Sequence, residues 1–257
     1  MASPPDPIAV EPRDVAAFER TRATVLARIA SACEAAGRDP AGITLVAVSK
    51  TVPVDRLRAA VAAGLTTLGE NRVQEAADKV SGVPDATWHL IGPLQSNKAR
   101  RAVELFDVIQ SVDSVELCLR LDRLAGEVRP GTRLPVLLQV NVDDDPAKAG
   151  FARARLPAAL ETLGRCDSLA IDGLMTIGRL VAEPEQARTT FRRLRVASDE
   201  LRAGGHAVGP ALSMGMSDDY PIAVEEGATI VRVGRALFGE RHDHEHDHGP
   251  AHSHARP

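Results

Sequence analysis

The sequence is poor in aromatic residues and cysteine, and it has no long apolar run. Phe, Trp and Tyr make up only 3% of the 257 residues, so aliphatic side chains must supply most of the 44% hydrophobic content of a core. The three cysteines are odd in number and widely spaced, which predicts reduced thiols, with neither a disulfide framework nor metal-ligand spacing. No apolar stretch reaches the roughly 18 residues of a membrane span.

Concentrated positive charge is also missing. The formal net charge is −4, and the arginines are spread along expected helices, which argues against nucleic acid as the main partner. The first residues, MASPPDPIAVEP, lack the basic and then apolar plan of a signal peptide. We therefore expect a soluble, cytoplasmic protein, either a monomer or a weak homodimer, that binds neither membranes nor nucleic acid.

What is present is a regular alternation of strand and helix patterns. Short apolar runs predict eight strands, at 43–50, 66–69, 87–91, 108–111, 135–141, 169–175, 211–214 and 229–233. Helical spacing predicts a helix between each pair of strands and one more before the first strand. The pattern favours a single (β/α)8 barrel with an extra N-terminal helix, and a doubly wound open sheet is the alternative.

Three segments are expected along the chain. Residues 12–240 form the barrel, and residues 1–11, rich in proline and acidic residues, form a disordered lead-in. Residues 241–257 hold six of the eight histidines and form a disordered tail, because this composition cannot build a core. No linker divides the chain.

Lys50 is the candidate reactive amine. It ends the apolar run ITLVAVSK, and α/β folds place their chemistry at the carboxyl ends of parallel strands. A lysine becomes nucleophilic when burial or a nearby cation lowers its pKa. The alternative is a solvated lysine at the mouth of the strand.

Arg232 is a charge inside the last apolar strand, TIVRVG. A guanidinium in a core strand must find an acceptor, because burying it alone costs several kcal/mol. It either faces a ligand or forms an ion pair with an acidic residue of a neighbouring strand.

The loops after the last two strands predict a phosphate site, because barrels often bind phosphate there. Ser217 can donate a hydroxyl, and Gly234 lets the backbone N–H groups of Gly234 and Arg235 approach an anion. Ser217 could equally cap a helix. Asn71 could hydrogen-bond a phenolic oxygen of a ligand, or it could cap the helix that follows it.

A Schiff-base amine, a phosphate site and a ring-facing arginine together describe a site for pyridoxal 5′-phosphate (PLP). A phosphosugar aldolase that uses the lysine without a cofactor is the competing interpretation. The sequence predicts no catalytic residue and no metal ligand.

Seven ordered motifs resemble the pyridoxal phosphate homeostasis protein family. They are AVSKTVP, LGENRVQE, WHLIGPLQSNK, VNVDDDPAKAGF, GLMTIG, LSMGMSDDY and VRVGRALFG. The resemblance implies an alanine-racemase-like barrel of fold type III and the following contacts: Lys50 as the internal aldimine lysine, Ser217, Gly234 and Arg235 at the phosphate, Arg232 by the pyridine nitrogen, and Asn71 and Met214 near the ring. The histidine-rich tail is no part of the family pattern.

The resemblance also implies a role in vitamin B6 and amino-acid balance without clear enzyme activity. PLP and PLP-dependent apoenzymes are the candidate partners. An amino-acid racemase is the alternative. A protonated Arg232 would keep a facing pyridine nitrogen unprotonated, and a neutral ring is a weak electron sink. Racemisation then needs a second base, and the only tyrosine, Tyr220, is expected to pack or to bond the backbone.

Overall fold

The expected alternation of strands and helices is present in the computed structural model, which describes residues 11–179 and 181–239. Expectations for 1–10 and for the tail therefore lie outside the described residues. Eight of the nine strands, all parallel to their neighbours, form the ring: β1 (Thr44–Val48), β2 (Thr67–Glu70), β3 (Thr87–Leu90), β4 (Val108–Val112), β5 (Leu134–Asn141), β7 (Leu169–Met175), β8 (Ala211–Ser213) and β9 (Ile230–Val233).

Two pairings decide between a barrel and an open sheet. β4 pairs with β5, and β1 pairs with β9, so the row of strands closes on itself. The (β/α)8 barrel is confirmed, and the doubly wound sheet is wrong. The sequence did not predict β6 (Phe151–Ala152), which pairs with β5 outside the ring.

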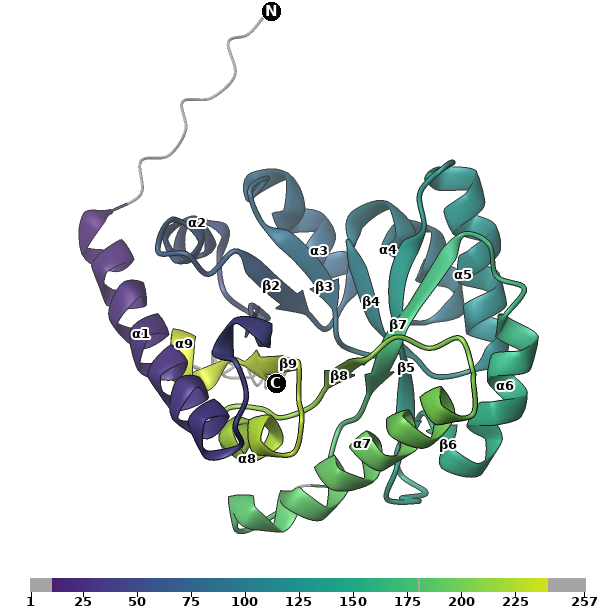
Figure 1. Ribbon diagram of the computed structural model, residues 1–257. Coiled ribbons are helices and arrows are strands. Elements are labelled where there is room, and N and C mark those ends of the chain that lie inside the picture. Colours follow the sequence, from purple (N-terminus) through teal and green to yellow (C-terminus); the bar gives the residue numbers. More distant parts are fainter. Residues whose placement is uncertain (1–10, 180, 240–257) are drawn as a thin grey trace, which may run out of the picture.

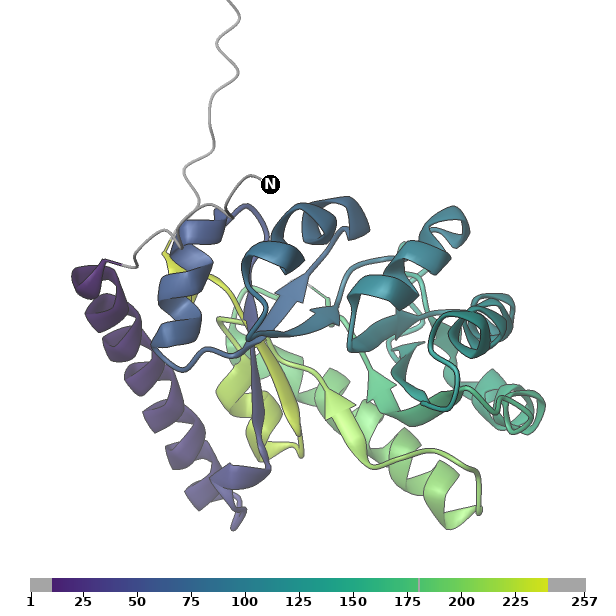
Figure 2. The ribbon, with the colours of Figure 1, turned by 90° about the horizontal axis from the view of Figure 1, so that it is seen from above.

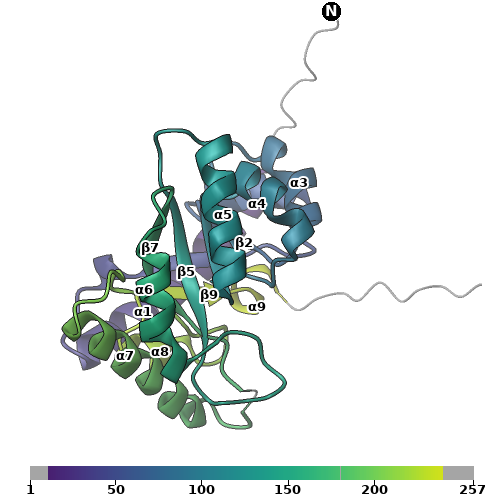
Figure 3. The ribbon, with the colours of Figure 1, turned by 90° about the vertical axis from the view of Figure 1, so that its right-hand side faces the viewer.

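Helices surround the strands (Figure 1). They are α1 (Pro12–Ala35), α2 (Val54–Ala62), α3 (Val73–Lys79), α4 (Ala99–Leu105), α5 (Val115–Val128), α6 (Leu156–Leu163), α7 (Arg188–Ala203), α8 (Tyr220–Glu225) and α9 (Arg235–Phe238). Their apolar faces are turned inward because apolar residues recur at helical spacing, as with Phe191, Leu194 and Leu201 of α7. Figure 3 shows α5 and α6 beside β5 and β7.

The extra N-terminal helix is also confirmed. α1 starts with Pro12, whose fixed φ suits the first helical position. It lies along one flank, where it contacts α2, α8 and α9 (Figures 1 and 2). α1 therefore supports the two short helices that follow β8 and β9.

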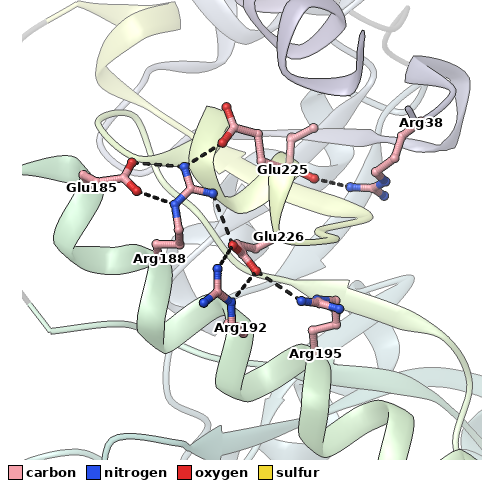
Figure 4. Close-up of polar contacts among 8 residues, drawn as sticks. Arg38, Glu185, Arg188, Arg192, Arg195, Glu225 and Glu226 are labelled. Carbon is pink, nitrogen blue, oxygen red and sulfur yellow. Dashed lines mark hydrogen bonds and ion pairs between the residues drawn. The ribbon is translucent and has the colours of Figure 1, made fainter. Parts of the chain in front are cut away.

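A cluster of charged residues fixes α8 against α7 (Figure 4). Glu226 is buried and pairs with Arg188, Arg192 and Arg195 of α7 at 3.2, 2.9 and 3.3 Å. Arg38, after α1, donates to backbone carbonyls at the end of α8 and just beyond it. The cluster holds the short helix that follows the loop after β8.

None of the described helices combines the length and hydropathy required to cross a membrane.

Candidate functional site

The carboxyl ends of β1, β2, β8 and β9 bring the sequence-predicted residues to one end of the barrel. β1 lies between β2 and β9. A Cβ added to Gly234 would lie 3.4 Å from the Cβ of Val48 at the end of β1. The loop after β9 therefore lies beside the turn that carries Lys50, as the barrel predicts.

Lys50 lies two residues after β1, in a turn, and is partly buried. Thr51 has φ of 65°, a left-handed conformation that costs free energy for a residue with a β-branched side chain. Glu75 accepts a hydrogen bond from the backbone N–H of Thr51. The bond to Glu75 therefore stabilises the turn in this conformation.

A buried ion cluster fixes the other side of this turn. Lys79 donates to the carbonyl oxygen of Ser49 at 2.9 Å, to Glu70 at 2.8 Å and to Glu75 at 2.7 Å. Ser49 also donates its hydroxyl to Glu70 at 2.7 Å. Because these bonds reach the residues on both sides of Lys50, we define Glu70, Glu75 and Lys79 as the Lys50 brace.

Burial and pairing shift the two carboxylates of the brace in opposite directions. Desolvation raises the pKa of the fully buried Glu70 more than the bonds from Lys79 and Ser49 lower it. Burial also acts to raise the pKa of Glu75, but the bonds from Lys79 and Thr51 outweigh it and lower that pKa. The brace was not predicted from the sequence, although the i,i+4 spacing of Glu75 and Lys79 is a visible helix signal.

Arg232 is 4% exposed and contacts neutral groups. It donates to the hydroxyl of Ser213 at 2.6 Å and to the carbonyl of Thr176 at 2.9 Å. Desolvation lowers the pKa of Arg232 to about 10, with Asp219 acting in the opposite direction, so the group stays charged at neutral pH. None of the ion pairs within residues 11–179 and 181–239 includes Arg232, so the alternative of a structural ion pair is not supported there.

The loops after β8 and β9 meet at Ser217 and Gly234. The backbone N–H of Gly234 donates to the Ser217 hydroxyl oxygen at 3.2 Å. Gly215 shapes the first loop: its φ is 90°, and an added Cβ would lie 2.5 Å from the Cβ of Ala223. The side chain of Arg235 is exposed and pairs with Asp218, so only its backbone is available to this site.

Asn71 is half-buried directly after β2. The neighbouring loop packs closely on it, because a Cβ on Gly92 would lie 2.4 Å from the Asn71 carbonyl oxygen. Met214 directly follows β8 and is fully buried in the apolar core. The two residues therefore lie at the strand ends predicted from the sequence. Asn71 is at the partly exposed rim of the barrel, and Met214 is in its interior.

Tyr220 packs between α8 and α1. Its ring is fully buried at the start of α8, and the guanidinium of Arg28 on α1 lies 5.1 Å from the ring centroid. Burial raises the pKa of Tyr220, against the opposing effect of Arg28. The expectation of a packing role agrees with this placement.

The described residues contain no cluster of His, Cys, Asp and Glu that could hold a metal ion.

Comparisons with known proteins identify the family. Residues 25–242 match the family model of the alanine racemase N-terminal domain. The pyridoxal phosphate homeostasis protein of Pseudomonas aeruginosa is 46% identical over 223 residues, which cover 85% of this chain and 94% of that protein. The protein of the same name from Escherichia coli is 38% identical over 225 residues, with 85% and 94% covered.

Solved structures show the same fold. PipY of Synechococcus elongatus, with PLP bound, is 45% identical with a TM-score of 0.73, covering 84% of this chain and 100% of that chain. An alanine racemase of Clostridium difficile is similar in fold alone: it is 14% identical with a TM-score of 0.65, covering 79% of this chain and 54% of the racemase. The family model and the close relatives together show that the chain belongs to the pyridoxal phosphate homeostasis protein family.

Proposed function

We propose that this chain binds PLP at the carboxyl end of its barrel and holds it for PLP-dependent apoenzymes, without catalytic turnover. The observation that carries the proposal is Arg232, a buried guanidinium whose two bonded neighbours are an uncharged hydroxyl and a carbonyl. Burying a charge is costly unless it gains strong partners. A ligand with an acceptor atom would give the guanidinium a strong partner, which the neutral groups of Ser213 and Thr176 are not.

Gly234 supports a phosphate site beside Arg232. Its φ of −115° is open to any residue, and the nearest atom to an added Cβ lies at an ordinary contact distance of 3.4 Å. The fold itself therefore does not require glycine here. A closely approaching anion does, because a side chain would shield the backbone N–H groups of Gly234 and Arg235.

Each remaining residue has a role in this proposal. When bound, PLP supplies an aldehyde that condenses with a lysine amine with loss of water, and a ring that can withdraw electrons. Lys50 would carry the covalent link, and Ser217 with the two backbone N–H groups would bind the phosphate. Arg232 would donate to the ring nitrogen, with Asn71 and Met214 bordering the ring.

Two features favour holding over turnover. A protonated Arg232 keeps a facing ring nitrogen unprotonated, which weakens electron withdrawal. Racemisation would also need a base on each face of the substrate, and Tyr220 is packed under Arg28 of α1. PipY with PLP bound and the relatives named for PLP homeostasis support the same assignment.

The proposal also covers the location and the assembly of the protein. We propose that residues 12–240 act as one PLP-binding domain in the cytoplasm, as a monomer or a weak homodimer. Support for a reducing compartment comes from Cys33, Cys118 and Cys166, which are free and buried.

The test is to add PLP to the purified chain, reduce with borohydride and map the modified lysine by mass spectrometry. We expect a single adduct, at Lys50. Lys50→Ala should lose the adduct yet retain weak PLP binding through the phosphate, while the matched control Lys98→Ala should behave as the parent. An adduct spread over several lysines, or an unchanged adduct in Lys50→Ala, would overturn the proposal.

Turnover is tested separately. The PLP-loaded chain is incubated with single-enantiomer alanine and serine, and in parallel with an apoenzyme that needs PLP. We expect activation of the apoenzyme without racemisation. Racemisation at ordinary enzyme rates that Tyr220→Phe abolishes would refute the holding role.

A further inference from the structure

We infer that His89 and Gln110 are positioning residues for Arg232, acting through a hydrogen-bond relay of fixed direction; the inference rests on the proposed function for its link to PLP. Arg232 of β9 donates to Ser213 of β8 at 2.6 Å, and Ser213 donates to Oε1 of Gln110 on β4 at 2.6 Å. Nε2 of Gln110 lies 2.7 Å from Nδ1 of His89 on β3. All four side chains are buried.

The direction follows from the donors that each group owns. A guanidinium can only donate, so the Ser213 oxygen accepts from Arg232 and its single proton must find another acceptor. Within the described part of the chain, that acceptor is Oε1 of Gln110. The amide NH2 of Gln110 then faces His89, so Nδ1 of His89 must be unprotonated and its proton must lie on Nε2.

The opposite direction is disfavoured by burial. If the amide of Gln110 were flipped, its NH2 would donate to Ser213, and the hydroxyl proton would lose the acceptor that it has here. Leaving the proton of a fully buried hydroxyl without an acceptor is unfavourable, because the hydroxyl has lost its bonds to water. Burial also lowers the pKa of His89 to about 4, against the effect of Asp107, so a neutral ring with one free lone pair is present at pH 7.

The relay gives Arg232 a fixed orientation. A long guanidinium side chain has many rotamers, and a bond to a hydroxyl that could itself rotate would restrain it weakly. Gln110 removes that rotation by accepting the hydroxyl proton, and His89 removes the amide flip by accepting from Nε2. Residues on β3 and β4, across the barrel from β9, therefore set the direction of the group proposed to face the PLP ring.

The direct test is the tautomer of His89, read from 15N chemical shifts at pH 7 in the full-length, PLP-free chain. His89→Gln assigns the signals by their loss. We expect the Nε2–H tautomer in the parent. In Gln110→Glu the carboxylate can only accept, so His89 should switch to the Nδ1–H tautomer. Gln139→Glu, the same change at another buried strand position, is the matched control and should leave the tautomer unchanged.

The Nδ1–H tautomer in the parent would overturn the relay, and so would an unchanged tautomer in a folded Gln110→Glu. The parent spectrum alone keeps the inference falsifiable if that variant does not fold. The link between the relay and PLP is tested with Gln110→Met. This variant should weaken PLP affinity by about threefold to tenfold, the loss of roughly one hydrogen bond. It should also shift the pH at which the visible absorption band of bound PLP titrates. Unchanged affinity and titration would overturn the positioning role. If the parent binds no PLP, the proposed function fails, while the tautomer still decides the relay.

Discussion

The ammonium group of Lys79 and the carboxylate of Glu70 lie 2.8 Å apart, both buried, next to the turn that carries Lys50. Lys79 also donates to the carbonyl of Ser49, so this ion pair holds the backbone immediately before the candidate amine. The pair is thus a structural feature with a direct effect on the site.

Replacing Lys79 by Met should therefore be strongly destabilising. Glu70 would be left buried without its cation, and breaking a buried pair costs about 3–5 kcal/mol. The measurement is the free energy of unfolding in urea. Lys98→Met, at a partly exposed lysine outside the Lys50 brace, should change it by less than about 0.5 kcal/mol. Equal effects of the two variants would show that the Lys50 brace contributes no specific stability.

Glu226 predicts an acid-sensitive stability. Burial acts to raise its pKa, but hydrogen bonds from Arg192 and Arg188 outweigh burial, and the pKa lies below its ordinary value of 4.5. A carboxylate with a lowered folded-state pKa contributes stability above its unfolded pKa, and that stability is lost as pH falls through the folded value. The free energy of unfolding, measured at a series of pH values from 7 downward, should thus decrease once the pH is below 4.5.

Glu226→Gln should remove part of this acid dependence and cost about 1–2 kcal/mol at pH 7, because the arginines lose a charged acceptor. Glu104→Gln, in an exposed pair with Arg101, is the control and should leave both the stability and its pH dependence unchanged. A parent and a Glu226→Gln variant with parallel pH profiles would contradict the assignment.

Two glycine substitutions should separate folding from binding. Gly234→Ala should keep the parent melting temperature, because neither its φ nor its neighbours exclude a methyl group, but should bind PLP more weakly. Gly215→Ala should lower the melting temperature, because a Cβ would collide with Ala223 at a φ of 90°. Thermal unfolding and PLP titration are measured on both. A Gly234→Ala variant that binds PLP as tightly as the parent would place the phosphate elsewhere.

The hydroxyl of Ser217 should contribute roughly 1.5–3 kcal/mol to PLP binding, the range for a hydrogen bond to a charged group. Ser217→Ala is compared by equilibrium titration with Ser96→Ala, an exposed serine before α4. The first should raise the dissociation constant and the second should not. An unchanged constant for Ser217→Ala would show that the phosphate is held by other groups.

A chain ending at Gly239 should bind PLP like the full chain, since every candidate site residue precedes that position. The six tail histidines should bind divalent metal weakly and independently of PLP. Calorimetric titration with Ni²⁺ on both chains, with and without PLP, checks this. Loss of PLP binding on truncation would give the tail a part in the main function.

Strand order and the positions of Lys50, Asn71, Ser217 and Gly234 could be predicted because apolar runs mark parallel strands and the polar residue after each run marks its carboxyl end. The type of each helix was harder to predict from the sequence. A proline ahead of a helical pattern predicts the first position of an α-helix, but Pro184 begins a 3-10 turn, Pro184–Ala187, ahead of α7. The capping box of Glu183 and Gln186 stabilises that turn.

The Lys50 brace and the relay behind Arg232 could not be predicted, because they depend on tertiary proximity. Gln110 and Ser213 are 103 residues apart, and no periodicity links a glutamine in one strand to a serine in another. Arg232 could be singled out as a charge in an apolar strand. Its actual partners, a hydroxyl and a carbonyl, became visible only in the folded chain.

The pairing of β1 with β9 joins the first strand of the barrel to the last. Lys50 leaves the ribosome well before Gly234 and Arg235. The two sides of the proposed pocket thus meet when the final seam of the barrel is made, and closing so long a loop is a slow step. A ligand that binds only the closed barrel would then protect it from unfolding at that seam.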